Sequence, residues 1–224
     1  MILEKSKVIR LQDLPQSGYV DGDKADFVKD FIRINHIYRS AMQEASTRLD
    51  ILDSEFATIY NHSPIHHMEC RVKTLDSILE KMKRKNLELR IDNVYKLQDI
   101  AGIRVICNYV DDIYYLRKLL ISSNGFELIR ESDYIKHPKP NGYRSLHLIV
   151  SVPFVISEGR MELSVEIQLR TIAMDMWASL EHELRYKSGR VFSEAEAAEL
   201  LQCSRDLAAV DQKMQELFQG KHQD

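Results

Sequence analysis

The stretch ELSVEIQLR, residues 162–170, limits what this chain can fold into more than any other. Apolar and polar residues alternate through its whole length, and a period of two predicts a β-strand with one buried and one polar face. The polar face carries Glu166, Gln168 and Arg170. A solvated sheet face is the simpler interpretation of this pattern, and the floor of a ligand site is the alternative.

A second stretch with a polar face precedes it. In YRSLHLIV, residues 143–150, the side chains of Tyr143, Ser145 and His147 fall on one side of a predicted strand. If the two strands lie in one sheet with these faces together, they present hydroxyl, imidazole, carboxylate, amide and guanidinium groups to the same space. That combination suggests a ligand floor, but taken alone these two strands still favour the solvated sheet face.

Composition narrows the class of protein. The chain has 224 residues, which suits one large domain or a core domain with helical appendages. Its formal net charge of −3 gives no general attraction to nucleic acid or an anionic membrane, and no apolar run is long enough for a bilayer span. The three cysteines are odd in number and widely spaced, which argues against a disulfide framework or a zinc site. We therefore expect a cytoplasmic protein without a signal peptide.

The first third of the chain has a helical period. We expect residues 1–24 to be a loosely held lead-in, followed by two packing helices. The first apolar stripe consists of Phe27, Phe31, Ile34, Tyr38 and Ala41, and the second of Leu49, Leu52, Phe56 and Ile59. His62, His66 and His67 then flank Pro64 in a predicted loop. They lack a carboxylate or thiol at a standard ligand spacing, so we interpret them as surface or structural histidines.

Residues 71–85, RVKTLDSILEKMKRK, predict a helix with two stripes. One is apolar, with Val72, Leu75, Leu79 and Met82; the other consists of Lys73, Ser77, Lys81 and Arg84. An exposed lysine-rich helix is the common explanation. The alternative is a binding surface for a polyphosphate, because localised cations in an acidic chain indicate an anion site.

Asp99 stands at the start of the apolar strand predicted over residues 101–107, and Arg104 interrupts that strand. Gly102 in the same strand permits close backbone approach. A second carboxylate, Glu166, lies on another predicted strand, and such a pair can hold Mg²⁺ together with substrate phosphates. A helix over residues 110–122 and a strand over residues 126–134 follow. The loop over residues 135–142 is basic and holds two prolines, so it is either a lid or a solvated connection.

Five fragments, taken in order, resemble the synthetase domain of the RelA/SpoT family, and the short chain resembles its small alarmone synthetases. They are RVK…KMKRK, QDIAGIRV, NGYRSLH, VEIQLRT and MDMWASLEHELRYK. The resemblance implies an α+β fold, with a mixed sheet of about five strands flanked by helices and related to nucleotidyltransferases. It implies a synthetase domain over residues 65–190, between a helical N-terminal extension (1–64) and a C-terminal oligomerisation helix (191–224).

The same resemblance implies transfer of pyrophosphate from ATP to the 3′-hydroxyl of GDP or GTP, which makes (p)ppGpp. It assigns Mg²⁺ to Asp99 and Glu166, in agreement with the pairing above. It assigns adenine to Arg71 and Arg104, the triphosphate to Lys73, Ser77, Lys81 and Arg84, and guanine to Tyr143 with Lys139, His147 and Gln168 nearby. Glu166 is the expected general base, because it faces the polar floor and can lie beside the metal.

Two other functions stay open at this point. A related enzyme pyrophosphorylates the 3′ end of tRNA, but it needs a basic surface that a net charge of −3 does not favour. A non-catalytic guanine-nucleotide-binding regulator is the other, although both acids and Tyr143 are retained. The chain lacks a His-Asp dipeptide and room for the family's hydrolase domain, so we expect synthesis without hydrolysis.

The tail predicts one more helix. Ser193 and Glu196 have the spacing of a capping box. Apolar residues then repeat by seven in two series: Leu200, Leu207 and Met214, and Cys203, Val210 and Leu217. Such a repeat suggests a coiled-coil-like seam between subunits, with packing on its own domain as the alternative. We expect a homo-oligomer, with a tetramer favoured by the family resemblance.

Overall fold

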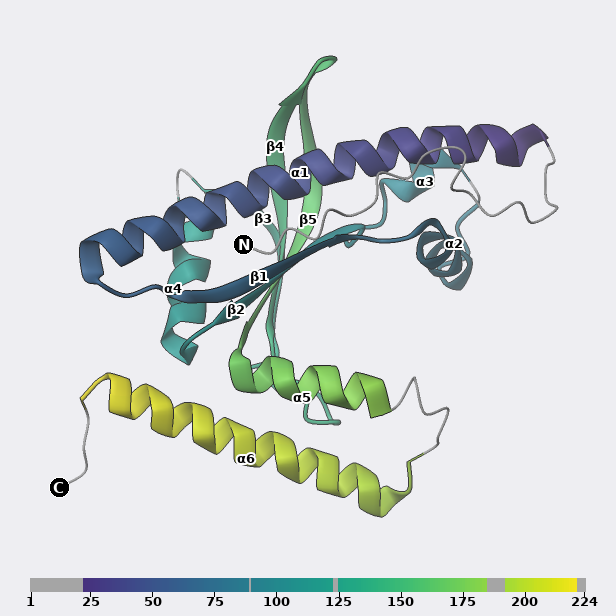
Figure 1. Ribbon diagram of the computed structural model, residues 1–224. Coiled ribbons are helices and arrows are strands. Elements are labelled where there is room, and N and C mark those ends of the chain that lie inside the picture. Colours follow the sequence, from purple (N-terminus) through teal and green to yellow (C-terminus); the bar gives the residue numbers. More distant parts are fainter. Residues whose placement is uncertain (1–21, 89, 123–124, 185–191, 221–224) are drawn as a thin grey trace.

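The computed structural model describes residues 22–88, 90–122, 125–184 and 192–220. A five-stranded sheet lies at its centre, with the strand order β1-β2-β5-β4-β3 (Figure 1). The strands are β1 (Ile65–Val72), β2 (Ala101–Cys107), β3 (Glu127–Asp133), β4 (Leu146–Ile156) and β5 (Gly159–Thr171). Strands β2 and β5 are parallel and the other neighbours are antiparallel. The predicted α+β fold with a mixed sheet of about five strands is confirmed.

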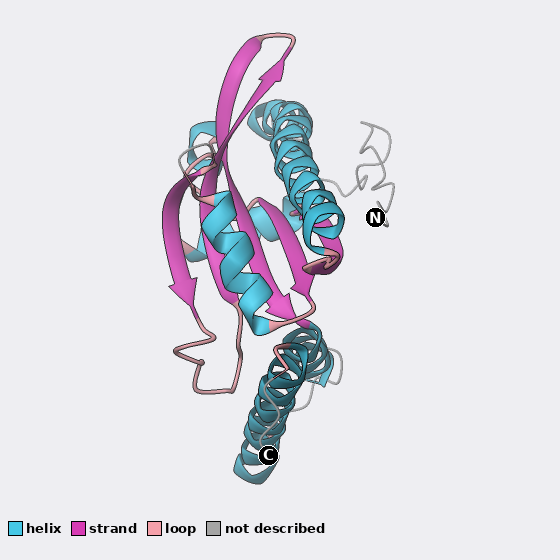
Figure 2. Cartoon of the chain, turned by 90° about the vertical axis from the view of Figure 1, so that its left-hand side faces the viewer, coloured by secondary structure: helices cyan, strands magenta, loops and turns pink. Residues whose placement is uncertain are grey.

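Helices surround this sheet. They are α1 (Gly22–Tyr60), α2 (Leu75–Arg84), α3 (Ile91–Val94), α4 (Val110–Leu120), α5 (Ile172–His182) and α6 (Glu194–Phe218). Figure 2 shows the long helix α1 along one side of the sheet, with α6 below the sheet. Within the described ranges, no helix is both long and apolar enough to cross a membrane.

The alternation in β5 separates a core face from a polar face. Val165, Ile167 and Leu169 are fully buried, and they share one hydrophobic core with residues of α1 and α4 such as Tyr38 and Leu116. Because successive strand residues point to opposite faces, the polar residues between them line the other side of the sheet. The apolar packing on one face therefore fixes which side chains are available for a site on the other.

The two N-terminal helices that we predicted are a single helix. The first apolar stripe is buried as predicted where its side chains are described, since Phe31, Ile34 and Tyr38 are at most 2% exposed. The second stripe continues on the same helix, and its last residue, Ile59, is 60% exposed. The residues that join the stripes contain neither glycine nor proline, so nothing in them ends the helix. The predicted lead-in lies largely outside the described residues.

The loop predicted around the histidines is also wrong in part. His66 and His67 belong to β1, which pairs along the whole length of β2. A β-bulge between Ile65 and His67 breaks the period of two, and this hid the strand in the sequence. The basic helix starts later than predicted, at Leu75, because the Thr74 hydroxyl caps it by accepting from the Ser77 N–H at 3.3 Å.

The apolar stripe of α2 also differs from the prediction. Ile78 and Met82 are its buried residues, whereas Leu75 and Leu79 are half-buried. Strand β4 begins at Leu146, after Tyr143 and Ser145. Ser145 is fully buried and donates to the Leu169 carbonyl at 3.2 Å, so it does not belong to the polar floor.

Helix α6 packs beside α5 at one end of the sheet (Figure 1). The predicted capping box of Ser193 and Glu196 is present. Trp177 of α5 donates its indole N–H to the Leu200 carbonyl of α6 at 2.9 Å. One face of α6 thus packs on its own chain, while Val210 on the other face is 51% exposed. The domain boundary predicted at residue 190 lies outside the described residues, and the one at residue 64 falls between α1 and β1.

Candidate active site

The strand register collects the polar side chains predicted for the site. Gly102 of β2 lies opposite Glu166 of β5, and Arg104 lies opposite Gln168. On the other side of β5, His147 of β4 lies opposite Gln168. Three neighbouring strands therefore contribute to one patch on the face that the core leaves free. The absence of a side chain at Gly102 leaves the space beside Glu166 open.

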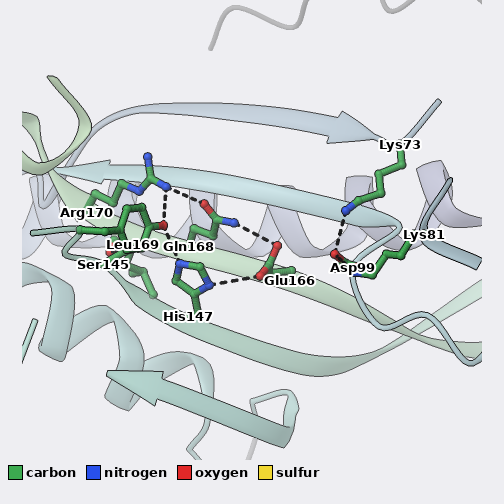
Figure 3. A network of polar contacts seen from close by, with 10 residues as sticks. Lys73, Lys81, Asp99, Ser145, His147, Glu166, Gln168, Leu169 and Arg170 are labelled. Carbon is green, nitrogen blue, oxygen red and sulfur yellow. Dashed lines mark hydrogen bonds and ion pairs between the residues drawn. The ribbon is translucent and has the colours of Figure 1, made fainter. Parts of the chain in front are cut away.

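Asp99 stands just before β2 and is held by two lysines. Lys73 Nζ donates to its Oδ2 at 2.7 Å, and Lys81 Nζ donates to the same oxygen. Figure 3 shows these contacts, with Glu166 nearby on the sheet. Lys73 follows β1 and Lys81 lies on α2, so the carboxylate ties the strand and the helix together.

The ionised form of Asp99 is favoured. Burial raises the pKa of this carboxyl, but the hydrogen bonds and charges of Lys73 and Lys81 outweigh burial and leave its pKa below the ordinary value. Its second oxygen, Oδ1, is buried and has no hydrogen-bond partner in the described part of the chain. A buried carboxylate oxygen without a partner is costly unless a ligand occupies it. Asp99 is therefore ionised, and its Oδ1 atom is available to coordinate a ligand.

Glu166 is the second carboxylate of the site. His147 Nδ1 lies 3.2 Å from its Oε1, and the Gln168 amide donates to its Oε2 at 3.0 Å. Burial raises the pKa of Glu166, but the contacts with His147 and Gln168 outweigh burial and lower it overall. The negative charge of Asp99 acts in the opposite direction and raises the pKa of Glu166.

A chain of hydrogen bonds links Glu166 to the residue predicted to stack on a base. Arg170 Nη2 donates to the Tyr143 hydroxyl at 2.6 Å, and that hydroxyl lies 2.8 Å from His147 Nε2. Because the arginine can only donate, the hydroxyl is free to donate to Nε2, and Nδ1 then carries the proton that faces Glu166. The chain fixes the orientation of both rings relative to the carboxylate.

The predicted acceptor residues cluster around the Tyr143 ring. Lys139 Nζ lies 4.7 Å from the centre of that ring and 4.6 Å from the centre of the Tyr134 ring. The ammonium therefore occupies a position against the face of Tyr143 where a base could stack. Lys139, Tyr143, His147 and Gln168 are thus brought together as the sequence predicted.

Five of the six residues predicted for ATP line a separate cleft of about 420 Å³ beside β1 and α2. It is lined by Arg71, Lys73, Ser77, Lys81 and Arg84, together with Val72, Thr74 and Glu80. Four of the five predicted residues in this cleft are cationic, which suits a polyphosphate. Lys73 and Lys81 belong both to the cleft and to the Asp99 cluster.

Arg104, the sixth residue predicted for ATP, is not among the residues that line this cleft. Its Nη1 donates to Glu69 at 2.9 Å and lies 3.5 Å from Asp175 of α5. Its Nε is buried and has no partner among the described residues. Arg71 pairs in register with Gly102, two residues from Arg104 on the neighbouring strand. The two guanidinium groups therefore come from adjacent strands, and Arg104 is tied to two carboxylates.

The donor set of Asp99 and Glu166 fits Mg²⁺. Mg²⁺ prefers oxygen ligands and is commonly held by one or two carboxylates plus substrate phosphates, and Asp99 Oδ1 is a buried oxygen without a partner. Among the described residues, no group of three or more His, Cys, Asp or Glu side chains is placed to hold a metal ion. Of the three histidines that flank Pro64, His62 pairs with Asp112 at 2.8 Å, and His66 and His67 contact each other.

Arg170 and Asp175 are two residues of the site to which the sequence pattern assigned no role. Arg170 is 5% exposed and also donates to Gln168 at 3.0 Å and to Asp175 at 3.1 Å. The signal for Arg170 was present, because it continues the polar alternation after Glu166 and Gln168. Asp175 gave no signal, since an acid in the first turn of a helix is common.

A protein-family model and a known relative match most of the site-bearing part of this chain. The family described as "Region found in RelA / SpoT proteins" matches residues 70–191. GTP pyrophosphokinase YwaC of Bacillus subtilis is 38% identical over 179 residues, which cover 80% of this chain and 85% of that protein.

Solved structures match as well. Small alarmone synthetase 1 of Bacillus subtilis bound to its product pppGpp has a TM-score of 0.78 at 35% identity, covering 86% of this chain and 98% of that one. The same synthetase bound to AMPCPP has a TM-score of 0.71 at 32% identity, over 86% and 97% of the two chains. The matched segment contains both carboxylates, Asp99 and Glu166, and the chain belongs to the RelA/SpoT family.

Proposed function

We propose that this protein is a (p)ppGpp synthetase that transfers the pyrophosphate group of ATP to the 3′-hydroxyl of GDP or GTP. One observation carries the proposal: Asp99 stands just before β2, and Glu166 lies opposite Gly102 of that strand, so the two carboxylates come together on one part of the sheet (Figure 3). On one side of them is a cationic cleft, and on the other is the Tyr143 cluster. The relatives support it, since YwaC is a GTP pyrophosphokinase and synthetase 1 binds pppGpp.

ATP belongs in the cleft beside α2. Its triphosphate can be bound by Lys73, Ser77, Lys81 and Arg84, and its base by Arg71 and Arg104. In the structure, Lys73 and Lys81 neutralise Asp99, so ATP binding requires these lysines to share their charge with the phosphates. Asp99 and Glu166 would hold Mg²⁺, which would supply charge neutralisation and orientation of the phosphates. The AMPCPP complex of synthetase 1 supports an ATP site in this fold.

The acceptor nucleotide belongs on Tyr143. Its guanine base can stack on the ring, and Lys139 must leave the ring face to admit it. The 3′-hydroxyl is the nucleophile, so the enzyme needs alignment and a base rather than a nucleophilic side chain. Glu166 is that base. Its lowered pKa keeps it ionised at neutral pH, and His147 holds one of its oxygens in place.

Product analysis tests the proposal directly. The purified protein is incubated with ATP, Mg²⁺ and either GDP or GTP, and the products are separated by ion-exchange chromatography. We expect ppGpp from GDP and pppGpp from GTP, with AMP released in equal amounts, and no product when the acceptor is omitted. Unchanged nucleotides under all conditions would contradict the proposal.

Tyr143→Ala and Arg104→Ala should separate the acceptor site from the donor site. Stacking on a base is worth about 1–3 kcal/mol, so Tyr143→Ala should raise the acceptor KM about tenfold or more. Titration calorimetry with a non-hydrolysable ATP analogue should give a nearly unchanged affinity. Arg104→Ala should show the opposite pattern.

Tyr143→Phe is the matched control for the acceptor site. It keeps the ring and removes only the hydroxyl that contacts His147 and Arg170. Because the stacking ring is kept and only its orienting hydrogen bonds are lost, we expect its acceptor KM to rise much less than that of Tyr143→Ala. If Tyr143→Ala instead lost the ATP analogue and kept its acceptor KM, the two sites would be assigned the wrong way round.

We also propose a cytoplasmic homo-oligomer, with a tetramer favoured. In the described ranges Cys70, Cys107 and Cys203 are free thiols, which suits a reducing compartment. The outer face of α6 exposes Val210, Met214 and Leu217 by 51–55%. Apolar side chains repeated on one helix face are typical of a contact between subunits. No stable binding of nucleic acid is expected from a net charge of −3.

Val210→Glu should reduce the assembly if this outer face is the subunit contact. Burying an unpaired carboxylate there is strongly unfavourable, whereas the same side chain on a solvated face costs little. Light scattering at equal protein concentration should therefore show a smaller particle mass for the variant. An unchanged mass would place the contact elsewhere on the molecule.

A further inference from the structure

Helix α6 reaches the loop that carries Tyr143. Ser204, which is 6% exposed, donates its hydroxyl to the carbonyl oxygen of Gly142 at 2.6 Å. Gly142 is the residue immediately before Tyr143, and Ser204 lies 62 positions further along the chain. The C-terminal helix thus holds the backbone next to the proposed stacking residue.

The contact leaves no room for change at Gly142. This residue has a φ of +94°, a conformation that favours glycine. A Cβ atom placed there would lie 2.8 Å from Ser204 Cβ and 3.3 Å from Leu201 Cδ1. The backbone of the loop therefore packs directly on the surface of α6, and a shift of α6 would displace the loop.

A second contact holds the other side of Tyr143. Arg144 Nη1 lies 4.0 Å from Asp211 Oδ2 of α6, and both side chains are mostly buried. Asp211 Oδ2 also accepts from the Thr171 hydroxyl at 2.7 Å. Thr171 ends β5 directly after Arg170, the residue that donates to the Tyr143 hydroxyl. Helix α6 is thus connected to the residues before and after Tyr143 and to the strand that orients its hydroxyl.

Backbone hydrogen bonds within the loop connect Gly142 with Lys139 and Tyr143. The Gly142 N–H donates to the Lys139 carbonyl at 2.8 Å, and the Lys139 N–H donates to the Tyr143 carbonyl at 3.1 Å. These two bonds close a turn between Lys139 and Tyr143. Movement of Gly142 would therefore move the ring and the ammonium group that lies against it.

We propose that α6 positions the acceptor site of this enzyme, with Ser204 and Asp211 as positioning residues that hold Gly142 and Arg144 and so fix the Tyr143 ring. The inference rests on the proposed function, because it takes Tyr143 as the binding surface for the guanine base. It gives α6 a role inside its own subunit, separate from any role in assembly. The expected consequence is selective for one substrate.

The selectivity follows from the sheet register. Asp211 contacts Thr171, which pairs with Cys107 at the far end of β2. The donor cleft lies at the opposite end, where Val72 of β1 pairs with Ala101. Loosening α6 should therefore raise the KM for the acceptor and leave the KM for ATP unchanged.

Ser204→Ala and Ser193→Ala form a matched pair for the test. Each variant removes one hydroxyl from α6, but Ser193 caps the start of the helix and Ser204 contacts the loop. Loss of one hydrogen bond should raise the acceptor KM of Ser204→Ala about three- to tenfold. The KM for ATP and the particle mass from light scattering should equal those of the wild type. Ser193→Ala should lower the melting temperature without changing the acceptor KM.

Asp211→Asn provides a second variant that preserves the packing. It keeps an oxygen for the Thr171 hydroxyl and removes the negative charge that faces Arg144. We expect an acceptor KM about two- to threefold above that of the wild type, because the pair at 4.0 Å is partly buried. The ATP KM should again stay unchanged.

The outcomes separate this inference from the proposed function. If Tyr143→Ala raises the acceptor KM while Ser204→Ala and Asp211→Asn leave it within twofold of the wild type, the positioning role is wrong and the acceptor site stands. Equal rises in both KM values, or a fall in particle mass, would also overturn the positioning role. If Tyr143→Ala has no effect on the acceptor KM, the acceptor site itself is misplaced and the inference fails with it.

Discussion

Glu166→Gln is expected to reduce the turnover number by about two orders of magnitude or more, because it removes both the proposed base and one negative charge beside the phosphates. The substitution keeps the size of the side chain and its hydrogen bond with Gln168 can be re-formed through the amide. Folding should survive, since the residue lies on the polar face of the sheet and not in the core. Steady-state synthesis of ppGpp and the melting temperature are the two measurements.

Glu162→Gln is the matched control. Glu162 lies on the same strand as Glu166 and on the same face of the sheet. It is exposed, and its described partner is the Ser151 hydroxyl at 2.9 Å. Its turnover number should stay within twofold of the wild type. Because the pKa of Glu166 is lowered, this carboxylate stays ionised throughout the neutral pH range. The turnover number of Glu166→Gln should therefore be reduced by the same factor at every pH in that range. Turnover near the wild-type value in Glu166→Gln would exclude Glu166 as the base.

The sheet could be predicted where the period of two is intact. The alternation over residues 162–170 lies within β5, and the apolar run over residues 101–107 coincides with β2. Strand β1 was not predicted, because its bulge and its polar residues leave no regular alternation in the sequence. Helix α1 was divided in two because a long helix changes its buried face along its length, and its last turns are exposed.

The site was predictable in its residue types and less so in its connections. Alternation, charge and the family resemblance pointed to both carboxylates and to the cations around residues 71–84. The sequence could not indicate that Lys73 and Lys81 both pair with Asp99, because that depends on how α2 packs against the start of β2. The contact between Ser204 and Gly142 was equally hidden, since a serine on a helix has no pattern that identifies its partner.

Asp99→Asn should reduce the turnover number by about two orders of magnitude or more, because it removes the carboxylate with the open coordination position. The same substitution should strengthen the binding of ATP although it weakens catalysis. In the wild type, Asp99 pairs with Lys73 and Lys81, the two lysines that we propose bind the triphosphate. Removing its charge leaves both ammonium groups available, so the affinity for a non-hydrolysable ATP analogue measured without Mg²⁺ should rise rather than fall.

The difference in stability between Asp99→Asn and the wild type should depend on pH. The pKa of Asp99 is lower in the folded protein than its ordinary value of 3.8, so its ion pairs stabilise the fold above that pH. This contribution is lost as the pH falls through the lower, folded value. The melting temperature of Asp99→Asn should therefore be below that of the wild type at neutral pH, and the difference should shrink below about pH 4.

Asp92→Asn is the control for both measurements, because the Asp92 side chain is 78% exposed and pairs only weakly with Arg90 at 3.4 Å. Its turnover number, melting temperature and affinity for the ATP analogue should match those of the wild type. If Asp99→Asn lost affinity for the analogue as well as turnover, Asp99 would be assisting ATP binding without metal rather than competing for its lysines. That result would require a different assignment of the two lysines, and it would leave the role of Glu166 untouched.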